Sequence, residues 1–336
     1  MAGAHANNFK AIDGCEIVAV CDVDLTRAEY FAAEHKVLAR FTDTAEMLKQ
    51  VEIDAVSIVT PDPFHTPISL QCLKAGKHVL CEKPLALHYA DARKMVVAAQ
   101  KAGVVNMVNF SYRNWPCIQA VAQRVQRGDI GEVMHVEASY LQAWLSSKVW
   151  GDWRTLPAWL WRLSTDHGSK GVLGDVGVHI VDFATYPVGP IAKVDCKLKT
   201  FPKAPKNRIG DYRLDANDSA VMTVEFKNGA LGVIHTTRWA TGHPNQLTLK
   251  IFGTLGAIEI NSEISRDSYR LCVGENVDQA KWETVEVEST PSNYQRFISA
   301  IATGKAEQPD FARGAEVQKV LDACFLSDAE GKQVRV

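Results

Sequence analysis

The sequence predicts an α/β protein in which a doubly wound parallel sheet is followed by a second α/β domain with a mostly antiparallel sheet. Up to about residue 113, short and wholly apolar runs alternate with amphipathic segments, as parallel strands covered on both faces by helices do. Beyond the turn Gly128-Asp129-Ile130-Gly131, longer runs alternate apolar with polar residues, which indicates antiparallel strands with one face covered. We expect domains over residues 1–115 and 116–336.

The first domain contains four apolar runs that predict strands and three amphipathic segments that predict helices. The expected strands are Glu16–Cys21, Ala55–Val59, His78–Cys81 and Val104–Phe110, and the expected helices are Leu25–His35, Thr66–Ala75 and Ala90–Ala102. Helices inserted between successive strands require crossover connections, so the sheet should be parallel.

The second domain opens with an expected helix over Ile118–Arg127 and continues with six alternating runs. The expected strands are Val133–Leu141, Lys193–Thr200, Ser219–Phe226, Leu231–Thr237, Leu247–Gly253 and Gly256–Asn261. Asn228-Gly229 separates two of these runs and is a strong signal for a hairpin turn.

Composition excludes several classes of protein. The formal net charge of the 336 residues is -2 with mixed signs throughout, so no basic surface is expected for nucleic acid or an anionic membrane. No apolar run approaches the roughly 20 residues of a membrane span, which makes the cytoplasm the expected location. The eight cysteines form no Cys-x-x-Cys pair, and we interpret them as reduced core residues, with disulfides or zinc as the alternative. No metal site is expected.

The first residues lack a feature that dinucleotide-binding domains share. Such a domain opens with a strand and a Gly-x-Gly-x-x-Gly turn at a helix amino terminus, where the pyrophosphate binds. Here Met1–Phe9 is typical of the helix after that turn, without the strand or its two glycines. We expect either about ten further residues in the natural protein, or a shortened sheet with weak or absent cofactor binding.

Two strand ends carry polar residues suited to a dinucleotide. Asp22 follows the strand that ends at Cys21, where an acidic residue accepts hydrogen bonds from the ribose and favours NAD over NADP. Asp22 as a turn or capping residue is the alternative. Arg27, one helical turn later, would suit the phosphate of NADP or be a solvated charge. The stiff segment Thr60-Pro61-Asp62-Pro63-Phe64-His65 follows the next strand and should lie in the ligand crevice, unless it is only a turn before a helix.

Lys83 follows the expected strand His78–Cys81, in the run Cys81-Glu82-Lys83-Pro84. A lysine beside a nicotinamide ring that becomes cationic on oxidation can lose its proton more readily and act in proton transfer. Taken alone, Glu-Lys-Pro is also an ordinary surface triplet.

A second candidate group lies in the segment Gly171–Asp182. If this segment is helical, Asp175, His179 and Asp182 stand at positions i, i+4 and i+7 and share one face. A carboxylate and an imidazole that project together can hold a substrate hydroxyl and move its proton. A surface pair on a helix is the alternative.

These segments, in this order, resemble the Gfo/Idh/MocA family of oxidoreductases. The resemblance is carried by Ala19-Val20-Cys21-Asp22, by the specific run from Ala75 to Pro84, by Asn109–Arg113, Gly128–Val133 and Asp175–Asp182. It implies an NAD(P)-dependent dehydrogenase or reductase with a Rossmann domain and an α/β domain whose large open sheet forms a homodimer or homotetramer interface.

The resemblance also implies roles for single residues. Lys83 matches the catalytic lysine, Asp175 the substrate-holding aspartate and His179 the general acid/base. The expected cofactor contacts are Asp22, Arg27, Thr60, Pro61, His65, Glu82, Asn109, Arg113, Trp161 and Arg162. The expected reaction moves a hydride between NAD(P) and a secondary alcohol or ketone of a sugar, sugar acid or cyclitol. An NAD-dependent glycosidase and a non-catalytic dinucleotide-binding regulator remain alternatives.

Five tryptophans between residues 144 and 161 bear on the substrate. Their rings suit the apolar faces of sugars, or they anchor a loop as core residues. Arg154 and Arg162 would bind the carboxylate of a sugar acid, or stack on these tryptophans.

Overall fold

The computed structural model describes all 336 residues, which form two compact units. The first unit contains residues 1–111 and 291–318, and the second contains residues 112–290 and 319–336. The expected boundary near residue 115 therefore lies close to the observed one, but residues 291–318 return to the first unit. The alternation of apolar and polar residues along the sequence cannot reveal such a return, because the return depends on contacts between distant segments.

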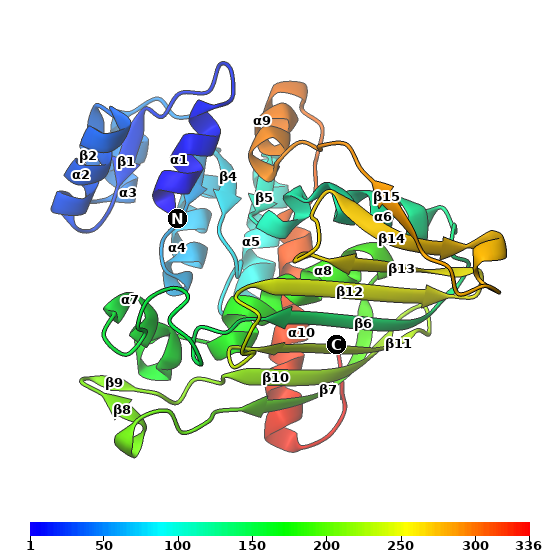
Figure 1. Cartoon of the computed structure of the whole chain (residues 1–336). Coiled ribbons are helices and arrows are strands. Elements are labelled where there is room, and N and C mark those ends of the chain that lie inside the picture. The colour runs from blue at the N-terminus through cyan, green and yellow to red at the C-terminus, as the bar shows by residue number, and fades with distance from the viewer. The chain divides into compact units, whose positions relative to one another are not determined.

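The first unit alternates strands with helices (Figure 1). Its strands are β1 (Ala19–Cys21), β2 (Ala39–Phe41), β3 (Ala55–Ile58), β4 (His78–Cys81) and β5 (Asn106–Val108). Its helices are α1 (Ala2–Lys10), α2 (Leu25–His35), α3 (Thr44–Gln50), α4 (His65–Lys74), α5 (Tyr89–Ala102) and α9 (Asn293–Thr303), with the start of α10 (Phe311–Glu330). The sequence analysis did not reveal β2, α3, α9 or α10, although α9 has an amphipathic pattern and a capping box at Ser292.

The parallel strands of this unit belong to two sheets rather than to one. β1 pairs only with β2, and β3, β4 and β5 form a separate sheet in that order. One edge of β1 and one edge of β3 consequently have no strand partner. Phe9 of α1 packs beside Leu80 and Met107 of the larger sheet and Phe297 of α9, so α1 belongs to the core of this unit.

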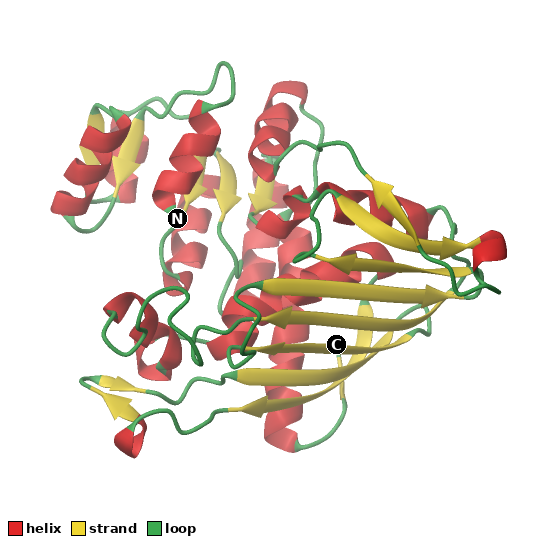
Figure 2. Cartoon of the chain, in the orientation of Figure 1, coloured by secondary structure: helices red, strands yellow, loops and turns green.

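The second unit is built on a nine-stranded sheet in the order β15-β14-β13-β12-β6-β11-β10-β7-β16 (Figures 1 and 2). Its strands are β6 (Val133–Leu141), β7 (Ile191–Lys199), β10 (Ser219–Phe226), β11 (Leu231–Thr237), β12 (Gln246–Gly253), β13 (Gly256–Asn261), β14 (Ser268–Val273), β15 (Glu283–Glu286) and β16 (Val334–Arg335). The predicted hairpin at Asn228-Gly229 joins antiparallel β10 and β11, with Gly229 at φ 91°.

Within this sheet one neighbouring pair, β6 and β11, runs parallel and the others run antiparallel, in agreement with the predicted mostly antiparallel sheet. Alternation reports which face of a strand is covered and does not report its direction, so the sequence pattern could not have shown the parallel pair. Helices α6 (Pro116–Gln126) and α8 (Val178–Val188) pack against strands of the sheet. The short helix α7 (Pro157–Leu160) and the two-residue strands β8 (Arg208–Ile209) and β9 (Tyr212–Arg213) lie in long connections.

The segment predicted to be one helix over residues 171–182 contains a change of pitch. Leu173–Gly177 forms a π-helical turn, and α8 continues from Val178. Such turns add a residue to the helix and occur often at functional sites.

None of the helices is both long enough and apolar enough to cross a membrane.

Candidate active site

The first unit places polar side chains at the carboxyl ends of its strands, where α/β sheets bind ligands. Asp22 follows β1, Thr60 follows β3, Lys83 follows β4 and Asn109 follows β5. The hydroxyl of Thr60 is buried and has no hydrogen-bond partner within the protein. A buried orphan hydroxyl at this place fits a polar ligand such as a dinucleotide, which would supply the missing partner.

Asp22 and Arg27 lie at the start of the β1–α2 connection. Asp22 is half-buried, and its Oδ1 accepts a hydrogen bond from the backbone N–H of Asp24 at 2.9 Å. The residue that caps α2 is Asp24, whose side chain accepts from Thr26 N. Arg27 is exposed and its Nε lies 3.4 Å from Asp24 Oδ2. The contacts of Asp22 and Arg27 with a cofactor remain predictions.

His65 ties together the segments that follow β3 and β4. Its ring is buried, with Nδ1 2.7 Å from the carbonyl oxygen of Pro84 and Nε2 2.8 Å from that of Thr60. The imidazole therefore connects the loop that contains Lys83 and Pro84 to the end of β3. Pro61 is exposed and precedes the 3₁₀ turn Asp62–Phe64.

Glu82, next to Lys83, is the centre of a buried polar network. Its Oε1 lies 2.8 Å from His5 Nε2 and accepts from Asn109 Nδ2 at 2.7 Å, while Oε2 accepts from the backbone N–H of Lys83 at 3.1 Å. Burial alone raises the pKa of this carboxyl. The hydrogen bond and charge of His5, with Lys83 and Asn109, outweigh that effect and lower the pKa to about 2.

The network continues through Asn109 to α9. Asn109 Nδ2 also donates to the hydroxyl of Tyr294 at 3.1 Å, and Asn109 Oδ1 accepts from Asn293 Nδ2 at 3.2 Å. Residues from α1, β4, β5 and α9 thus hold the peptide that precedes Lys83. Because His65, Glu82 and Asn109 bind protein groups, their expected contacts with a cofactor stay predictions, and supporting Lys83 is a role that the sequence did not suggest.

The second unit holds Asp175 in the π-helical turn. Asp175 is half-buried, and its Oδ2 accepts from Arg238 Nη2 at 3.0 Å and lies 3.6 Å from Arg162 Nε. Gly174 and Gly177 flank it, and a Cβ at Gly174 would lie 2.4 Å from Lys170 Cβ. The turn is therefore packed so closely that a larger residue could not replace Gly174 without a shift.

His179 is buried at the start of α8 beside two tyrosines. Its ring centroid lies 4.6 Å from that of Tyr112 and 6.3 Å from that of Tyr140, both edge to face. The hydroxyls of Tyr112 and Tyr140 are hydrogen-bonded to each other, and Tyr140 also donates to Asn245 Oδ1 at 2.8 Å. Burial and the neighbouring Tyr112 raise the pKa of Tyr140 well above its ordinary value, so Tyr140 keeps its proton.

Asp175 and Asp182, which the sequence predicts on one face with His179, form ion pairs with different arginines. Asp182 is buried and forms a two-pronged ion pair with Arg113, with Oδ2 2.8 Å from Nε and Oδ1 2.7 Å from Nη2. Asp175 pairs instead with Arg238, beyond the end of β11. The π-helical turn Leu173–Gly177 changes the rotation per residue near Asp175, so a common face for the three side chains stays a prediction. The pairing also gives Arg113 an internal partner, and its cofactor contact remains a prediction.

The tryptophan-rich segment is mostly a core. Trp144 and Trp153 are fully buried with Leu145, Leu163 and Leu214, while Trp150 and Trp159 are partly buried against them. Trp161 and Arg162 lie together, with the guanidinium 4.6 Å from the ring centroid, and Arg154 lies 4.5 Å from that of Trp153. Both arginines therefore stack on tryptophans, and the interpretation of Trp144 and Trp153 as core residues is confirmed.

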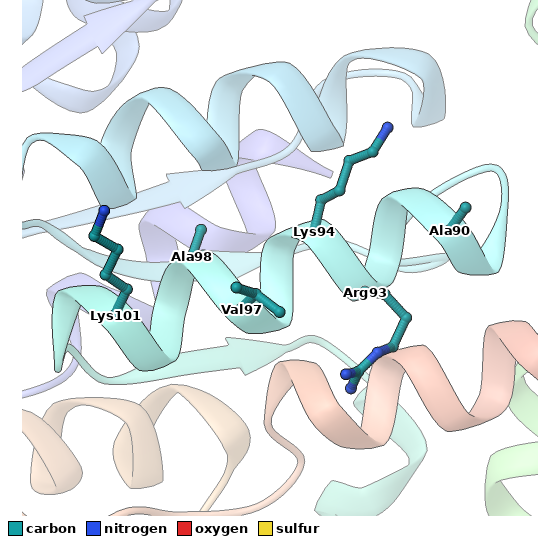
Figure 3. A pocket seen from close by; sticks show the side chains of 6 residues that line it. All are labelled: Ala90, Arg93, Lys94, Val97, Ala98 and Lys101. Atoms are coloured by element: carbon teal, nitrogen blue, oxygen red, sulfur yellow. The ribbon is translucent and has the colours of Figure 1, made fainter.

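One hollow in the first unit contains none of the predicted site residues. A groove of about 520 Å³ runs along α5 and is lined by Ala90, Arg93, Lys94, Val97, Ala98 and Lys101 (Figure 3). Its only charged side chains are the exposed arginine and two lysines, and we assign the groove no role.

No group of three or more His, Cys, Asp or Glu side chains has an arrangement that would hold a metal ion.

Sequence reasoning missed His5, Tyr112, Tyr140 and Arg238. A signal existed for Arg238, because Gly232, Ile234, Thr236 and Arg238 continue one buried face at a spacing of two. A charged residue at the next inward position of a strand implies a buried partner. His5 likewise lies on the buried face of α1 with Ala6 and Phe9.

Comparisons with known proteins agree with this arrangement. Residues 1–110 match the family described as "Oxidoreductase family, NAD-binding Rossmann fold", and residues 118–259 match the "GFO/IDH/MocA C-terminal domain". The chain is 30% identical to D-glucoside 3-dehydrogenase of Escherichia coli K12, over 99% of this chain and 93% of that protein. It is 29% identical to levoglucosan dehydrogenase of Pseudarthrobacter phenanthrenivorans, over 88% of this chain and 83% of that protein.

A solved structure gives the same result for the fold. Levoglucosan dehydrogenase in complex with NADH and levoglucosan superposes with a TM-score of 0.87 at 27% identity, covering 100% of this chain and 97% of that one. Both domains, in the same order, are thus matched in sequence and in structure. The chain belongs to the Gfo/Idh/MocA family of oxidoreductases, with an NAD-binding Rossmann domain followed by the family's C-terminal domain.

Proposed function

We propose that this chain interconverts a secondary alcohol and a ketone of a neutral sugar or cyclitol, with NAD as the hydride carrier. The observation that carries the proposal is that a family oxidoreductase retains Lys83 after β4 together with Asp175 and His179 around the start of α8. Relatives named as dehydrogenases of levoglucosan, of D-glucosides and of myo-inositol support a polyol substrate.

The protein's own groups account for the proton chemistry. Bound NAD supplies the site that accepts the hydride in the oxidation direction. The Lys83 ammonium donates a hydrogen bond to the reacting oxygen and stabilises it as negative charge develops. His179 takes the hydroxyl proton, and Asp175 accepts a hydrogen bond from a substrate hydroxyl and orients it. Lys83 belongs to one compact unit and the other two residues to the second, so their action on one substrate rests on the family resemblance.

The arginines near Asp175 favour a neutral substrate over a sugar acid. Arg162 lies 3.6 Å from Asp175 Oδ2 and stacks on Trp161, and Arg238 is buried and donates to the same oxygen. Binding a substrate carboxylate would require Arg162 to leave its own carboxylate. We therefore restrict the proposed substrates to uncharged polyols.

For the cofactor, we propose that Thr60 and Asp22 contribute to an NAD site whose affinity in this chain is low. The unpaired edges of β1 and β3 support low affinity, because the sheet that should present the strand ends is divided.

For assembly, we propose a homodimer or homotetramer that forms through the nine-stranded sheet. A monomeric mass from light scattering at micromolar concentration would contradict this.

The test is replacement of Lys83 by Ala, assayed as NADH formation with neutral sugars, cyclitols and sugar acids. We expect a loss of about 10²- to 10⁴-fold in kcat, with unchanged NAD binding, since Lys83 acts on the reacting oxygen. Lys74→Ala, at the exposed carboxyl end of α4, is the control and should leave the rate unchanged. Normal turnover by Lys83→Ala would refute the assignment, and a preference for sugar acids would refute the neutral substrate.

A further inference from the structure

Arg238 is a charged residue in a position where the strand pattern calls for an apolar one. It directly follows β11, and its side chain is fully buried on the same face as Ile234 and Thr236. A guanidinium in such a place is costly unless carboxylates and hydrogen-bond acceptors surround it. Its partners therefore indicate why the residue is there.

The guanidinium of Arg238 makes three directed contacts. Nη2 donates to Asp175 Oδ2 at 3.0 Å, and Nη1 donates to the carbonyl oxygen of Arg162 at 3.0 Å. The carbon at its centre lies 5.1 Å from the ring centroid of Trp144. A planar group held at two nitrogens and over one face has a single orientation, so it defines where Asp175 Oδ2 lies.

Behind Arg238 lies a second buried ion pair. Lys203 Nζ lies 2.8 Å from Asp218 Oδ2, and both side chains are fully buried. Burial lowers the pKa of Arg238, whereas the charges of Asp175 and Asp218 oppose that shift. Burial likewise raises the pKa of Asp218, which Lys203 opposes. The order Asp175, Arg238, Asp218, Lys203 alternates in sign and balances two positive with two negative charges, so Arg238 remains charged.

We propose that Arg238 is a positioning residue for Asp175, which it fixes in place as an acceptor for a substrate hydroxyl. The role of Asp175 as the group that holds the substrate rests on the proposed function. The ion pair between Asp175 and Arg238 rests on the observed distances alone. Arg162 adds a weaker contact from the solvent side, since its Nε is 3.6 Å from the same oxygen and its side chain is 30% exposed.

A positioning role predicts more than a loss of stability. The charged or titratable groups that act on Asp175 within its unit include Arg238 after β11, Arg162 in the 3₁₀ turn Trp161–Leu163 and Tyr140 of β6. Of these, Arg238 is the buried cation in hydrogen-bond contact. Its removal should make Asp175 harder to ionise, so the acid limb of kcat/KM should move to higher pH.

The test compares Arg238→Gln and Arg238→Lys with Arg154→Gln as a matched control. Arg154 also stacks on a tryptophan and pairs with an aspartate, Asp152, but does not contact Asp175. The carboxyl carbons of 13C-labelled Asp are titrated by NMR, and the signal of Asp175 is identified by its loss in Asp175→Asn. We expect the midpoint of Asp175 to rise by about 1 pH unit or more in Arg238→Gln, to change little in Arg238→Lys, and to stay fixed in Arg154→Gln.

Kinetics provide the second readout. If Arg238 acts through Asp175, Arg238→Gln should lower kcat/KM at least tenfold in the parent and have little further effect in the Asp175→Asn background. Should Arg238→Gln fail to fold, the same kinetic cycle is measured with Arg238→Lys, which keeps the charge but loses the fork of donors: it should lower kcat/KM in the parent and have little further effect in the Asp175→Asn background. An unchanged Asp175 midpoint, or fully additive kinetic effects, would overturn the proposal. If the parent oxidises no polyol, the proposed function fails, while the NMR titration still decides whether Arg238 controls Asp175.

Discussion

At the scale of single residues, the candidate site depends on ionised side chains that the protein buries and pairs. Glu82 is buried, yet its pKa is lowered to about 2 because His5, Lys83 and Asn109 surround it. Arg113 with Asp182 and Lys203 with Asp218 are further pairs whose members are almost entirely buried. Removing one member of such a pair leaves an uncompensated charge, so these residues should be much less tolerant of substitution than surface pairs.

Glu82→Gln should lower the stability of the protein in a way that depends on pH. The folded pKa of about 2 lies below the ordinary 4.5, so the ionised carboxylate stabilises the fold fully above about pH 4.5, and this contribution is lost as the pH falls toward 2. The difference amounts to about 3 kcal/mol at neutral pH. Denaturant unfolding should show a deficit for Glu82→Gln at neutral pH that is smaller by about 2 kcal/mol at about pH 3, where the contribution is only partly lost. Glu29→Gln, an exposed carboxylate of α2, is the control. A deficit that is the same at both pH values would contradict this explanation.

At the scale of elements, the π-helical turn before α8 determines where Asp175 points. The turn Leu173–Gly177 contains two glycines, and the space around Gly174 is already filled by Lys170. The same segment is anchored by Asn217, whose Oδ1 accepts from Leu173 N at 3.0 Å. Close packing and a side-chain anchor together keep this turn from relaxing into a regular α-helix.

Gly174→Ala should destabilise the protein by about 1 to 3 kcal/mol, because the new Cβ overlaps Lys170 Cβ, which cannot move without its backbone. Gly3→Ala is the matched comparison within a helix. There the nearest atom, His35 Nε2, is 3.6 Å away, and the substitution should stabilise α1 by about 0.4 to 1 kcal/mol. Calorimetric melting of both variants gives the sign of each change. A Gly174→Ala protein as stable as the parent would show that the turn is not tightly packed.

At the scale of the whole molecule, the dinucleotide-binding unit contains a divided sheet. β1 with β2 and β3 with β4 and β5 form separate ladders, and α1 packs into the core by Phe9. A strand that paired with both free edges would join the ladders and bury apolar side chains, at about 1.5 to 3 kcal/mol for each large one. The divided sheet is the observation that supports the proposed low affinity for NAD.

An added amino-terminal segment should therefore raise the affinity for NAD. The comparison is a calorimetric titration of NAD into the chain as it stands and into a version extended by an apolar strand and a glycine-rich turn. We expect the extended version to bind more tightly, because its turn would present backbone N–H groups to the pyrophosphate. Tight and equal binding by both versions would show that the divided sheet does not limit affinity.

The sequence by itself determined the features that depend on neighbouring residues. The apolar runs that form β4, β6, β10, β11 and β13 were predicted at their observed bounds, and the hairpin at Asn228-Gly229 was found from its turn residues. Lys83 could be chosen because its motif is contiguous and directly follows a strand. Membership of the family was also predictable, since its motifs occur in a fixed order along the chain.

Only the tertiary structure decided which distant groups meet. Asp175 and Arg238 are 63 residues apart, and His5 and Glu82 are 77 apart, so no periodicity within one element relates them. The parallel pairing of β6 with β11 and the return of residues 291–318 to the first unit likewise depend on how the chain re-enters a sheet or core. Local patterns report what each residue buries, whereas partners for buried charges are chosen by the packed fold as a whole.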